Sequence, residues 1–150
     1  MSVIATNFDG KTAGLTHLGS DAQETLLRKA YQTAGISDFS RTGVVECYGA
    51  GRPAGDLIEI AAIARLFGDF GVHITSVKPT LGHGGCASGI MSLIKSVLAL
   101  EQQTVPSNIK FSKPFKERNL TVPLEPTPWP QSTHECMRIN SFGMEGKTYM

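Results

Sequence analysis

The segment that most constrains the fold runs from Cys86 to Gln102, where apolar side chains recur with helical spacing. The pattern predicts one long helix. Apolar residues cover nearly its whole circumference, interrupted only by Ser92, Lys95 and Ser96. A helix that is apolar all round is buried on all sides. A single layered domain of 150 residues would leave one face of this helix in water, so its packing partner has to be identified.

The rest of the chain alternates between strand and helix patterns. Ser20–Gln23 is a capping box that opens a helix, which Gly35 ends. Asp56–Glu59 is a second capping box, opening a helix that runs to Phe67. Loops are expected at Asn7–Gly19, Gly49–Gly55 and Pro79–Gly85, and a proline-rich connection at Val105–Pro130. Strands are expected at Met1–Thr6, Gly43–Tyr48, His73–Val77, Leu120–Val122 and Met137–Phe142, the last in the chain. This order indicates a single α/β domain, residues 1–150.

Composition excludes several classes of protein. Hydrophobic residues make up 41% and charged residues 18%, which suits a folded core. The net charge of +1 favours neither a nucleic-acid nor a membrane partner. Without a signal pattern or a membrane-length apolar run, we expect a soluble cytoplasmic protein. Its three cysteines lack CxxC spacing, and its four histidines lie too far apart for a local metal site, so we expect no disulfide, metal or cofactor.

Three segments carry a resemblance to the ketosynthase family. Residues 45–59 read V-E-C-Y-G-A-G-R-P-A-G-D-L-I-E, similar to V-E-A-H-G-T-G-T-P-x-G-D-P-x-E. Residues 76–95 read S-V-K-P-T-L-G-H-G-G-C-A-S-G-I-M-S-L-I-K, similar to S-V-K-x-x-x-G-H-x-E-x-A-S-G-x-x-x-L-I-K. Residues 138–143, R-I-N-S-F-G, resemble the family's V-N-S-F-G. Asn7–Gly10 and Pro126–Pro130 match as well. Within the family, the residues of these motifs most resemble those of the highly reducing polyketide synthases of fungi.

The resemblance implies the C-terminal half of a thiolase-like fold, a mixed sheet with helices on both faces. The whole family fold has five layers, α-β-α-β-α, built from two similar halves. The half with the catalytic cysteine, in a T-A-C-S-S motif, has no counterpart in these 150 residues. We therefore expect a truncated, stand-alone domain that does not perform Claisen condensation. In the family, the helix that matches Cys86–Gln102 packs against its counterpart in the other half. We expect a homodimer in which two such helices pair and complete the five layers.

The family's two catalytic histidines fall at Tyr48 and His83, and its active-site lysine falls at Lys78. Histidine can act as a general acid or base near neutral pH. A tyrosine hydroxyl is a donor and a poor base. The resemblance thus implies catalytic roles for these three residues. Each also has a structural interpretation: a loop hydrogen bond for His83, packing at a strand end for Tyr48 and an ion pair for Lys78.

Four further residues are candidates for substrate binding. Phe142 matches the family's gating phenylalanine, and Asn140 lies in the same motif. Arg52, with Ala50, stands where the family has threonines that contact the pantetheine arm. Cys86 lies at the start of the predicted apolar helix, where a cysteine is more often a small packing residue than a reactive group. The acidic residue usual after the second histidine is replaced by Gly85, which weakens the expected support of the lysine.

Three functions are compatible with this pattern. The first is a tailoring enzyme that acts on a small-molecule polyketide intermediate by acid–base chemistry, through cyclisation, dehydration or isomerisation. The second is a non-catalytic partner or scaffold that complements or binds a polyketide synthase. The third is a gene relic without a role. A polyketide synthase and an acyl carrier protein are the candidate protein partners, and the sequence names neither substrate nor reaction.

Overall fold

A parallel sheet of four strands forms the centre of the computed structural model, which describes residues 4–8, 20–110, 119–131, 133, 136–142 and 147–149. Its strand order is β5-β3-β2-β7. The strands are β2 (Val44–Glu46), β3 (Val72–Thr75), β5 (Leu120–Thr121) and β7 (Met137–Ile139). The central strand β2 is buried throughout, as its β-branched valines favour. Strands β3 and β7 pair with β2 in parallel orientation, and β5 pairs with β3 in the same way.

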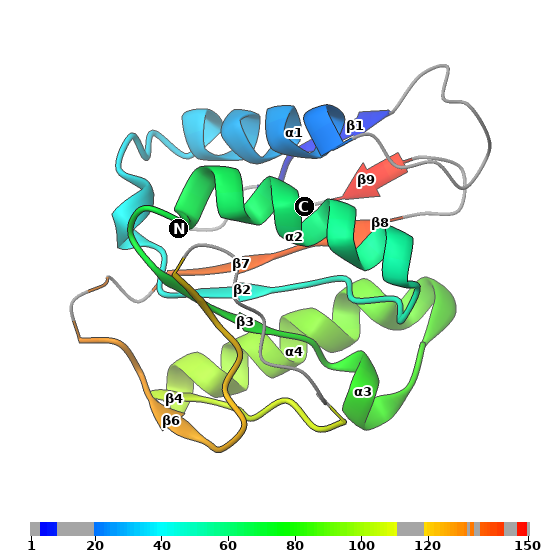
Figure 1. Ribbon diagram of the computed structural model, residues 1–150, viewed down its shortest axis with the longest axis vertical. Helices are drawn as coiled ribbons and strands as arrows, with labels where there is room; N and C mark the ends of the chain where they lie inside the picture. Colours follow the sequence, from blue (N-terminus) through cyan, green and yellow to red (C-terminus); the bar gives the residue numbers. More distant parts are fainter. Residues whose placement is uncertain are drawn as a thin grey trace.

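Helices cover both faces of this sheet (Figure 1). Helices α1 (Ser20–Thr33) and α2 (Pro53–Phe67) lie on one side, and α4 (Ser88–Glu101) lies on the other. The larger core lies beneath α1 and α2 and includes Leu27, Ile63 and Phe67. A smaller core on the α4 side joins Val44, Ala99, Val105 and Trp129. The expected α/β class and helices on both faces are confirmed.

The end of α1 follows the expected glycine signal. Gly35 has φ +67°, a left-handed conformation that glycine adopts without a Cβ penalty. The Ile36 amide donates to the Tyr31 carbonyl, and the Gly35 amide donates to the Gln32 carbonyl. These two hydrogen bonds form the Schellman motif, which satisfies carbonyls that the helix end would leave unpaired.

The start of α2 corrects one expectation. The helix begins at Pro53, three residues before the predicted capping box, and its N-cap residue Arg52 makes no side-chain cap. Proline suits the first helical position because its missing N–H would be unpaired there. Asp56 and Glu59 are therefore free to serve another purpose, described below.

Shorter elements complete the chain. Helix α3 (Lys78–Leu81) and the 3₁₀ turn at Gly85–Ala87 occupy segments expected to be loop or helix start. A further 3₁₀ turn, Phe39–Arg41, lies between α1 and β2. Strands β4 (Thr104–Val105) and β6 (Thr127–Pro128) pair within the proline-rich connection. Strands β1 (Thr6–Phe8), β8 (Ser141–Phe142) and β9 (Lys147–Tyr149) form an antiparallel sheet. Phe142 therefore does not end the last strand, and β1 starts later than expected.

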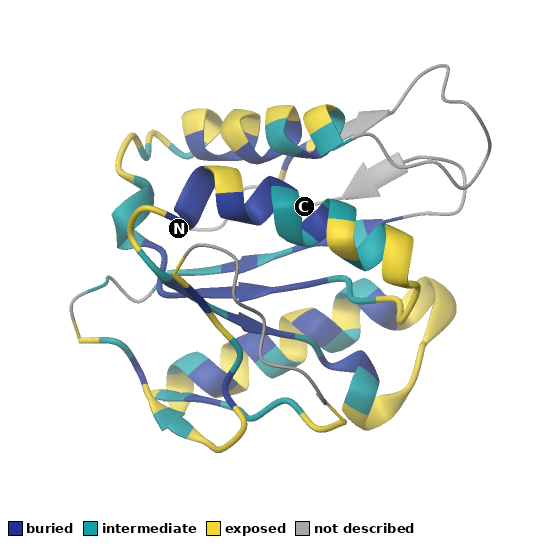
Figure 2. Cartoon of the chain, in the orientation of Figure 1, coloured by how far each residue is buried: buried dark blue, intermediate teal, exposed yellow. Residues whose placement is uncertain are grey.

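Helix α4 is turned so that its small and polar residues face the protein. Its buried residues are Ser88, Ser92, Ser96 and Ala99. Its exposed aliphatic residues, which we call the α4 face, are Ile90, Leu93, Ile94, Val97 and Leu98, between 46% and 62% exposed. Figure 2 shows the exposed positions along α4 and over the loop before it. The sequence predicted that a single domain would leave one face of this helix in water. This is the case for α4, and the face exposed to solvent is the apolar one.

Candidate functional site

The predicted catalytic residues gather beyond the carboxyl ends of the parallel strands. Tyr48 follows β2, Lys78 follows β3, and Phe142 lies in β8, directly beyond β7. His83 lies in the loop between α3 and α4. In open α/β sheets this edge is where ligands bind, because the loops that follow parallel strands meet there.

The Tyr48 ring is the centre of the cluster. Its centroid lies 5.9 Å from that of His83, edge to face, and 5.2 Å from that of Phe142. The Lys78 ammonium lies 3.9 Å from the centroid of the same ring and donates a hydrogen bond to the Tyr48 carbonyl. The structure thus brings together four of the residues that the sequence singled out: an imidazole, a phenol, an ammonium and a phenyl ring.

Exposure differs across this cluster. Lys78 and Phe142 are buried, Tyr48 is half-buried and His83 is exposed. Burial raises the pKa of Tyr48, and the carboxylate of Glu59 raises it further. Burial lowers the pKa of Lys78, while the neighbouring carboxylates of Glu59 and Glu46 oppose that change. The phenol is therefore held in its protonated form, as a hydrogen-bond donor.

Two carboxylates of α2 fix the loop that carries Tyr48. Glu59 accepts hydrogen bonds from the amides of Tyr48, at 2.8 Å, and Gly49, at 3.1 Å. The Asp56 carboxylate accepts hydrogen bonds from the backbone amides of Ala50, Gly51 and Arg52. Five consecutive amides, 48–52, thus point at two side chains. The spacing of Asp56 and Glu59 along the helix matches this loop, which explains a pattern that sequence reasoning assigned to capping.

Gly49 is required where this loop turns. Its φ is +50°, and a Cβ built there would lie 2.8 Å from the Ser76 Oγ. Both the left-handed backbone and the close approach exclude a side chain. The turn brings the backbone that follows β2 against the start of the segment that follows β3.

Glu59 also joins the loop to β7. Its Oε1 accepts a hydrogen bond of 2.9 Å from the Asn140 amide group, and the Asn140 Oδ1 accepts one of 3.2 Å from the Arg138 Nε. The Arg138 guanidinium lies 5.5 Å from the Tyr31 ring centroid. Burial lowers the pKa of Arg138 to about 10 and raises the pKa of Glu59, even though the Asn140 and backbone hydrogen bonds lower the latter.

A second buried carboxylate anchors α4. Glu46, fully buried in β2, accepts hydrogen bonds from the Thr75 hydroxyl at 2.5 Å and the Val77 amide at 2.6 Å. Its Oε2 also lies 2.7 Å from the Lys95 ammonium. Buried charges are stable only when paired and hydrogen-bonded, and this one directs Lys95, and with it the small-residue side of α4, toward the sheet.

The other sequence candidates lie apart from the Tyr48 ring. Asn140 is buried and its amide contacts Glu59, so in this structure it positions the loop from behind. Arg52 is exposed at the start of α2. Cys86 is exposed in the 3₁₀ turn, two residues before α4 begins. Their assignment to substrate binding stays a prediction.

Sequence reasoning missed Glu46 and Glu59 as parts of the site. A signal existed for Glu46, a lone charge within the apolar run Val44–Cys47, because a charge in a buried strand needs a partner. For Glu59 the signal was its three-residue spacing from Asp56, which favours two carboxylates at one end of a helix.

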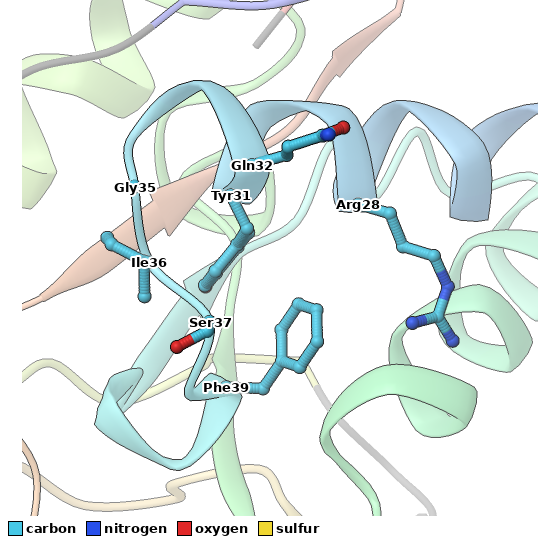
Figure 3. Close-up of a pocket in the computed structure, with 7 residues that line it drawn as sticks. All are labelled: Arg28, Tyr31, Gln32, Gly35, Ile36, Ser37 and Phe39. Carbon is cyan, nitrogen blue, oxygen red and sulfur yellow. The ribbon is translucent and has the colours of Figure 1, made fainter.

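A surface pocket lies at the other end of the sheet (Figure 3). It has a volume of about 440 Å³, and Tyr31, Phe39, Ile36 and Arg28 are among its lining residues. They belong to the end of α1 and the turn that precedes β2, whereas Tyr48 follows β2. The pocket therefore does not contain the candidate catalytic residues.

The described residues hold no group of three or more histidine, cysteine or acidic side chains placed to bind a metal. They also hold no helix with the length and apolar character needed to span a membrane.

Comparison with known proteins identifies the relatives. Residues 1–112 match the family described as beta-ketoacyl synthase, C-terminal domain. The chain is 53% identical over 146 residues to the highly reducing polyketide synthase g433 of a Fusarium species. It is 54% identical over 149 residues to the highly reducing polyketide synthase VdtX of Byssochlamys spectabilis. These alignments cover 94% and 95% of this chain but only 6% and 7% of the relatives.

Solved structures agree. The oxazolomycin ketosynthase domain OzmH KS8 of Streptomyces albus JA3453 superposes with a TM-score of 0.89 at 31% identity, over 98% of this chain and 42% of that one. The ketosynthase from module 6 of the bacillaene synthase of Bacillus subtilis 168 gives 0.88 at 31% identity, over 98% and 29%. The fold, the Tyr48 cluster and these matches lead to one conclusion: the chain belongs to the beta-ketoacyl synthase C-terminal domain family.

Proposed function

We propose that the Tyr48 cluster is an acid–base site that acts on a polyketide intermediate by proton transfer, through cyclisation, dehydration or isomerisation, and not by condensation. The observation that carries this proposal is the convergence of His83, Tyr48 and Lys78 around one ring at the carboxyl end of the sheet. A polyketide intermediate is proposed as the substrate because the relatives are highly reducing polyketide synthases.

Each group has a distinct part in the proposed reaction. The exposed His83 imidazole takes the proton from the carbon next to a carbonyl, and later returns one. The Tyr48 hydroxyl donates a hydrogen bond to the oxygen on which negative charge develops. The buried Lys78 ammonium, held on the Tyr48 carbonyl, orients the loop and offsets that charge. Phe142 supplies an apolar wall on the other side of the Tyr48 ring.

The cysteine beside this cluster in sequence is a poor nucleophile. Cys47 precedes Tyr48, but its side chain is buried. Burial raises its pKa well above the usual value, and the carboxylates of Glu59 and Glu46 raise it further. The thiolate, rather than the thiol, attacks an acyl group, so this cysteine does not supply the step that condensation needs.

Proton exchange tests the proposal without knowledge of the final product. An α-methyl-β-oxoacyl N-acetylcysteamine thioester is incubated with the protein in D₂O, and deuterium at the α carbon is followed by NMR. The expected result is exchange above the uncatalysed rate, reduced about a hundredfold or more in His83→Asn. His73→Asn is the matched control, because His73 lies in β3. Equal exchange rates for the two variants would refute the acid–base role of His83.

A partner or scaffold role is the second candidate, and the α4 face favours it. Five large aliphatic side chains are about half exposed on this one helix. Single exposed apolar residues are normal on a protein surface, whereas a contiguous apolar patch marks an interaction site. In this role the chain binds a polyketide synthase, or a copy of itself, and performs no chemistry. A stable complex in solution together with no proton exchange would favour this role over the first.

A further inference from the structure

We propose that the pocket of Figure 3 is a binding site for a small aromatic carboxylate, and that a buried line of hydrogen bonds connects it to the Tyr48 loop. The pocket contains none of the candidate catalytic residues, so this inference goes beyond the proposed function. One continuous stretch of chain, residues 28–39, supplies its described walls, on the side of the sheet that α1 and α2 cover. The pocket therefore does not depend on what packs against the α4 face.

The walls of the pocket suit a flat apolar ring. The rings of Tyr31 and Phe39 lie with their centroids 4.8 Å apart and their planes at 42°, and Figure 3 shows them side by side beneath the end of α1. Ile36 adds an aliphatic wall. A third ring gains from tilted contacts with the two already present. The volume of about 440 Å³ lies within the range of small-molecule sites.

Arg28 supplies the charge that selects a carboxylate. It is the only charged residue among the described residues that line the pocket. Its Nε and Nη2 donate to the Glu24 carboxylate, at 3.0 and 2.9 Å, with the guanidinium 5.8 Å from the Phe39 ring centroid. Its third nitrogen, Nη1, donates to no other described residue. A guanidinium held in place with one nitrogen still available favours an anionic ligand.

The helix end determines which way round the ligand lies. The carbonyl end of a helix carries partial negative charge, an effect that is confined to its last turn. Arg28 precedes the last turn of α1, so a carboxylate bound at Arg28 avoids this charge. The ring then lies toward Ile36, whose amide already satisfies a helix carbonyl. Asp38, the acidic residue of the same stretch, accepts hydrogen bonds from the amide and hydroxyl of Ser40.

The line of hydrogen bonds begins at Tyr31. Its ring lines the pocket, whereas its hydroxyl shares a hydrogen bond with the Thr42 hydroxyl and accepts one from the Arg138 guanidinium. The Arg138 Nε donates to the Asn140 Oδ1 at 3.2 Å, and the Asn140 amide group donates to the Glu59 Oε1 at 2.9 Å. None of these five residues is more than 6% exposed. Water therefore does not compete for these contacts.

The line ends on the Tyr48 loop, because Glu59 accepts the amides of Tyr48 and Gly49. Arg138 and Asn140 are alternate residues of an extended segment, so their side chains share one face. The line thus follows β7 from the end of the sheet that holds the pocket to the end that holds Tyr48. Coupling between distant sites is carried by contiguous networks of this kind. A ligand that moves the Tyr31 ring is expected to alter the Tyr48 loop.

Titration with 2-naphthoate tests the binding site. In a ¹H–¹⁵N spectrum of the chain, the amide signals of residues 35–39 are expected to shift and to saturate with a dissociation constant of about 1 mM. Arg28→Met keeps the aliphatic stem and is expected to weaken binding about fivefold. The matched control is Arg65→Met, because Arg65 pairs with the same Glu24 but does not line the pocket. It is expected to change the affinity by less than about twofold.

The uncharged alcohol 2-naphthalenemethanol tests the choice of a carboxylate. It carries the same ring, and is expected to bind the wild type about fivefold more weakly than the acid does. Its affinity is expected to be the same for Arg28→Met. The absence of a saturable shift at residues 35–39 would overturn the site. Equal affinity of the acid for the wild type and Arg28→Met would overturn it as an anion site.

The amides of Tyr48 and Gly49 test the connection. As naphthoate fills the pocket, their signals are expected to shift with the dissociation constant measured at residues 35–39. Tyr31→Phe keeps the ring and removes the hydroxyl, so it is expected to bind naphthoate without the shift at the loop. Thr42→Val is the matched control, because it removes the other partner of that hydroxyl and leaves the bond from Arg138. It is expected to keep the shift.

Two results would overturn the connection: unchanged Tyr48 and Gly49 signals in the wild type, or a shift that persists in Tyr31→Phe. Circular dichroism shows whether each variant is folded. If Tyr31→Phe does not fold, Arg138→Met interrupts the same line and is expected to give the same loss of the shift. These measurements involve no chemistry at His83. A failed proton-exchange assay would therefore refute the proposed function and leave the pocket and its connection standing.

Discussion

Replacing Glu59 by glutamine tests whether the buried carboxylate holds the Tyr48 loop. Glu59 is 2% exposed and accepts three hydrogen bonds, from the amides of Tyr48 and Gly49 and from Asn140. Glutamine has the same shape but only one acceptor oxygen. With that oxygen in the Oε1 position, the bonds from Tyr48 and Asn140 survive, and the new NH₂ group faces the N–H of Gly49.

The magnitude follows from what is lost and gained. A hydrogen bond to a charged group contributes about 1.5–3 kcal/mol, and an unsatisfied buried donor costs about 1–3 kcal/mol. Removal of a buried charge offsets part of this, because burial raises the pKa of Glu59. We expect Glu59→Gln to lower the free energy of unfolding by about 2 kcal/mol at neutral pH. Urea denaturation followed by circular dichroism measures it.

Glu24→Gln is the control. Glu24 pairs with Arg28 and Arg65 at the surface of α1, and such pairs contribute about 0–1 kcal/mol. Equal losses for Glu24→Gln and Glu59→Gln would refute the clamp. The pH dependence gives a second check. Since the pKa of Glu59 is raised above 4.5, its contribution is fully present below pH 4.5 and is lost as the pH rises through the raised pKa. Glu59→Gln should remove that part of the slope.

Three further outcomes follow from the same contacts. Lys95→Met leaves Glu46 without its counter-ion and should cost about 3–5 kcal/mol in urea denaturation, against less than about 1 kcal/mol for Lys29→Met. Gly35→Ala should lower the free energy of unfolding by about 1 kcal/mol, because the left-handed φ of +67° strains alanine although no atom obstructs its Cβ. Gly49→Ala should lower it further, because Ser76 also obstructs its Cβ. Thermal denaturation compares the two variants. Tyr48→Phe should slow proton exchange on the thioester about tenfold or more while leaving the fold unchanged, since only the donor is removed.

Local patterns were sufficient to predict much of the fold. The strand expected within Gly43–Tyr48 is present as β2 (Val44–Glu46), and α1 ends at the expected glycine, Gly35. The start of α2 could not be predicted in the same way, because Asp56 and Glu59 satisfy a capping rule equally well. Their actual role depends on a loop whose shape is set by contacts with Ser76 and Asn140, far away in sequence.

The site was predictable only as a set of residue types. The family resemblance named His83, Tyr48 and Lys78, and the structure places them around one ring. It could not indicate that the Lys78 ammonium donates to the Tyr48 carbonyl, nor that Asn140 faces Glu59. These contacts join residues 30 and 81 positions apart, and no local rule relates such positions. Which side of α4 faces the sheet could not be predicted for a similar reason, because it depends on the ion pair between Lys95 and Glu46.

The two carboxylates behind the Tyr48 loop restrict how an anion can be stabilised there. Enzymes that form oxyanions commonly use backbone amides as donors. Here the amides of residues 48–52 already point at Glu59 and Asp56. An oxyanion formed beside Tyr48 would find negative carboxylates behind this stretch of backbone, and its amides already engaged. Its stabilisation would have to come from side chains, the Tyr48 hydroxyl and the Lys78 ammonium, which makes this an oxyanion site built without the backbone of its own loop.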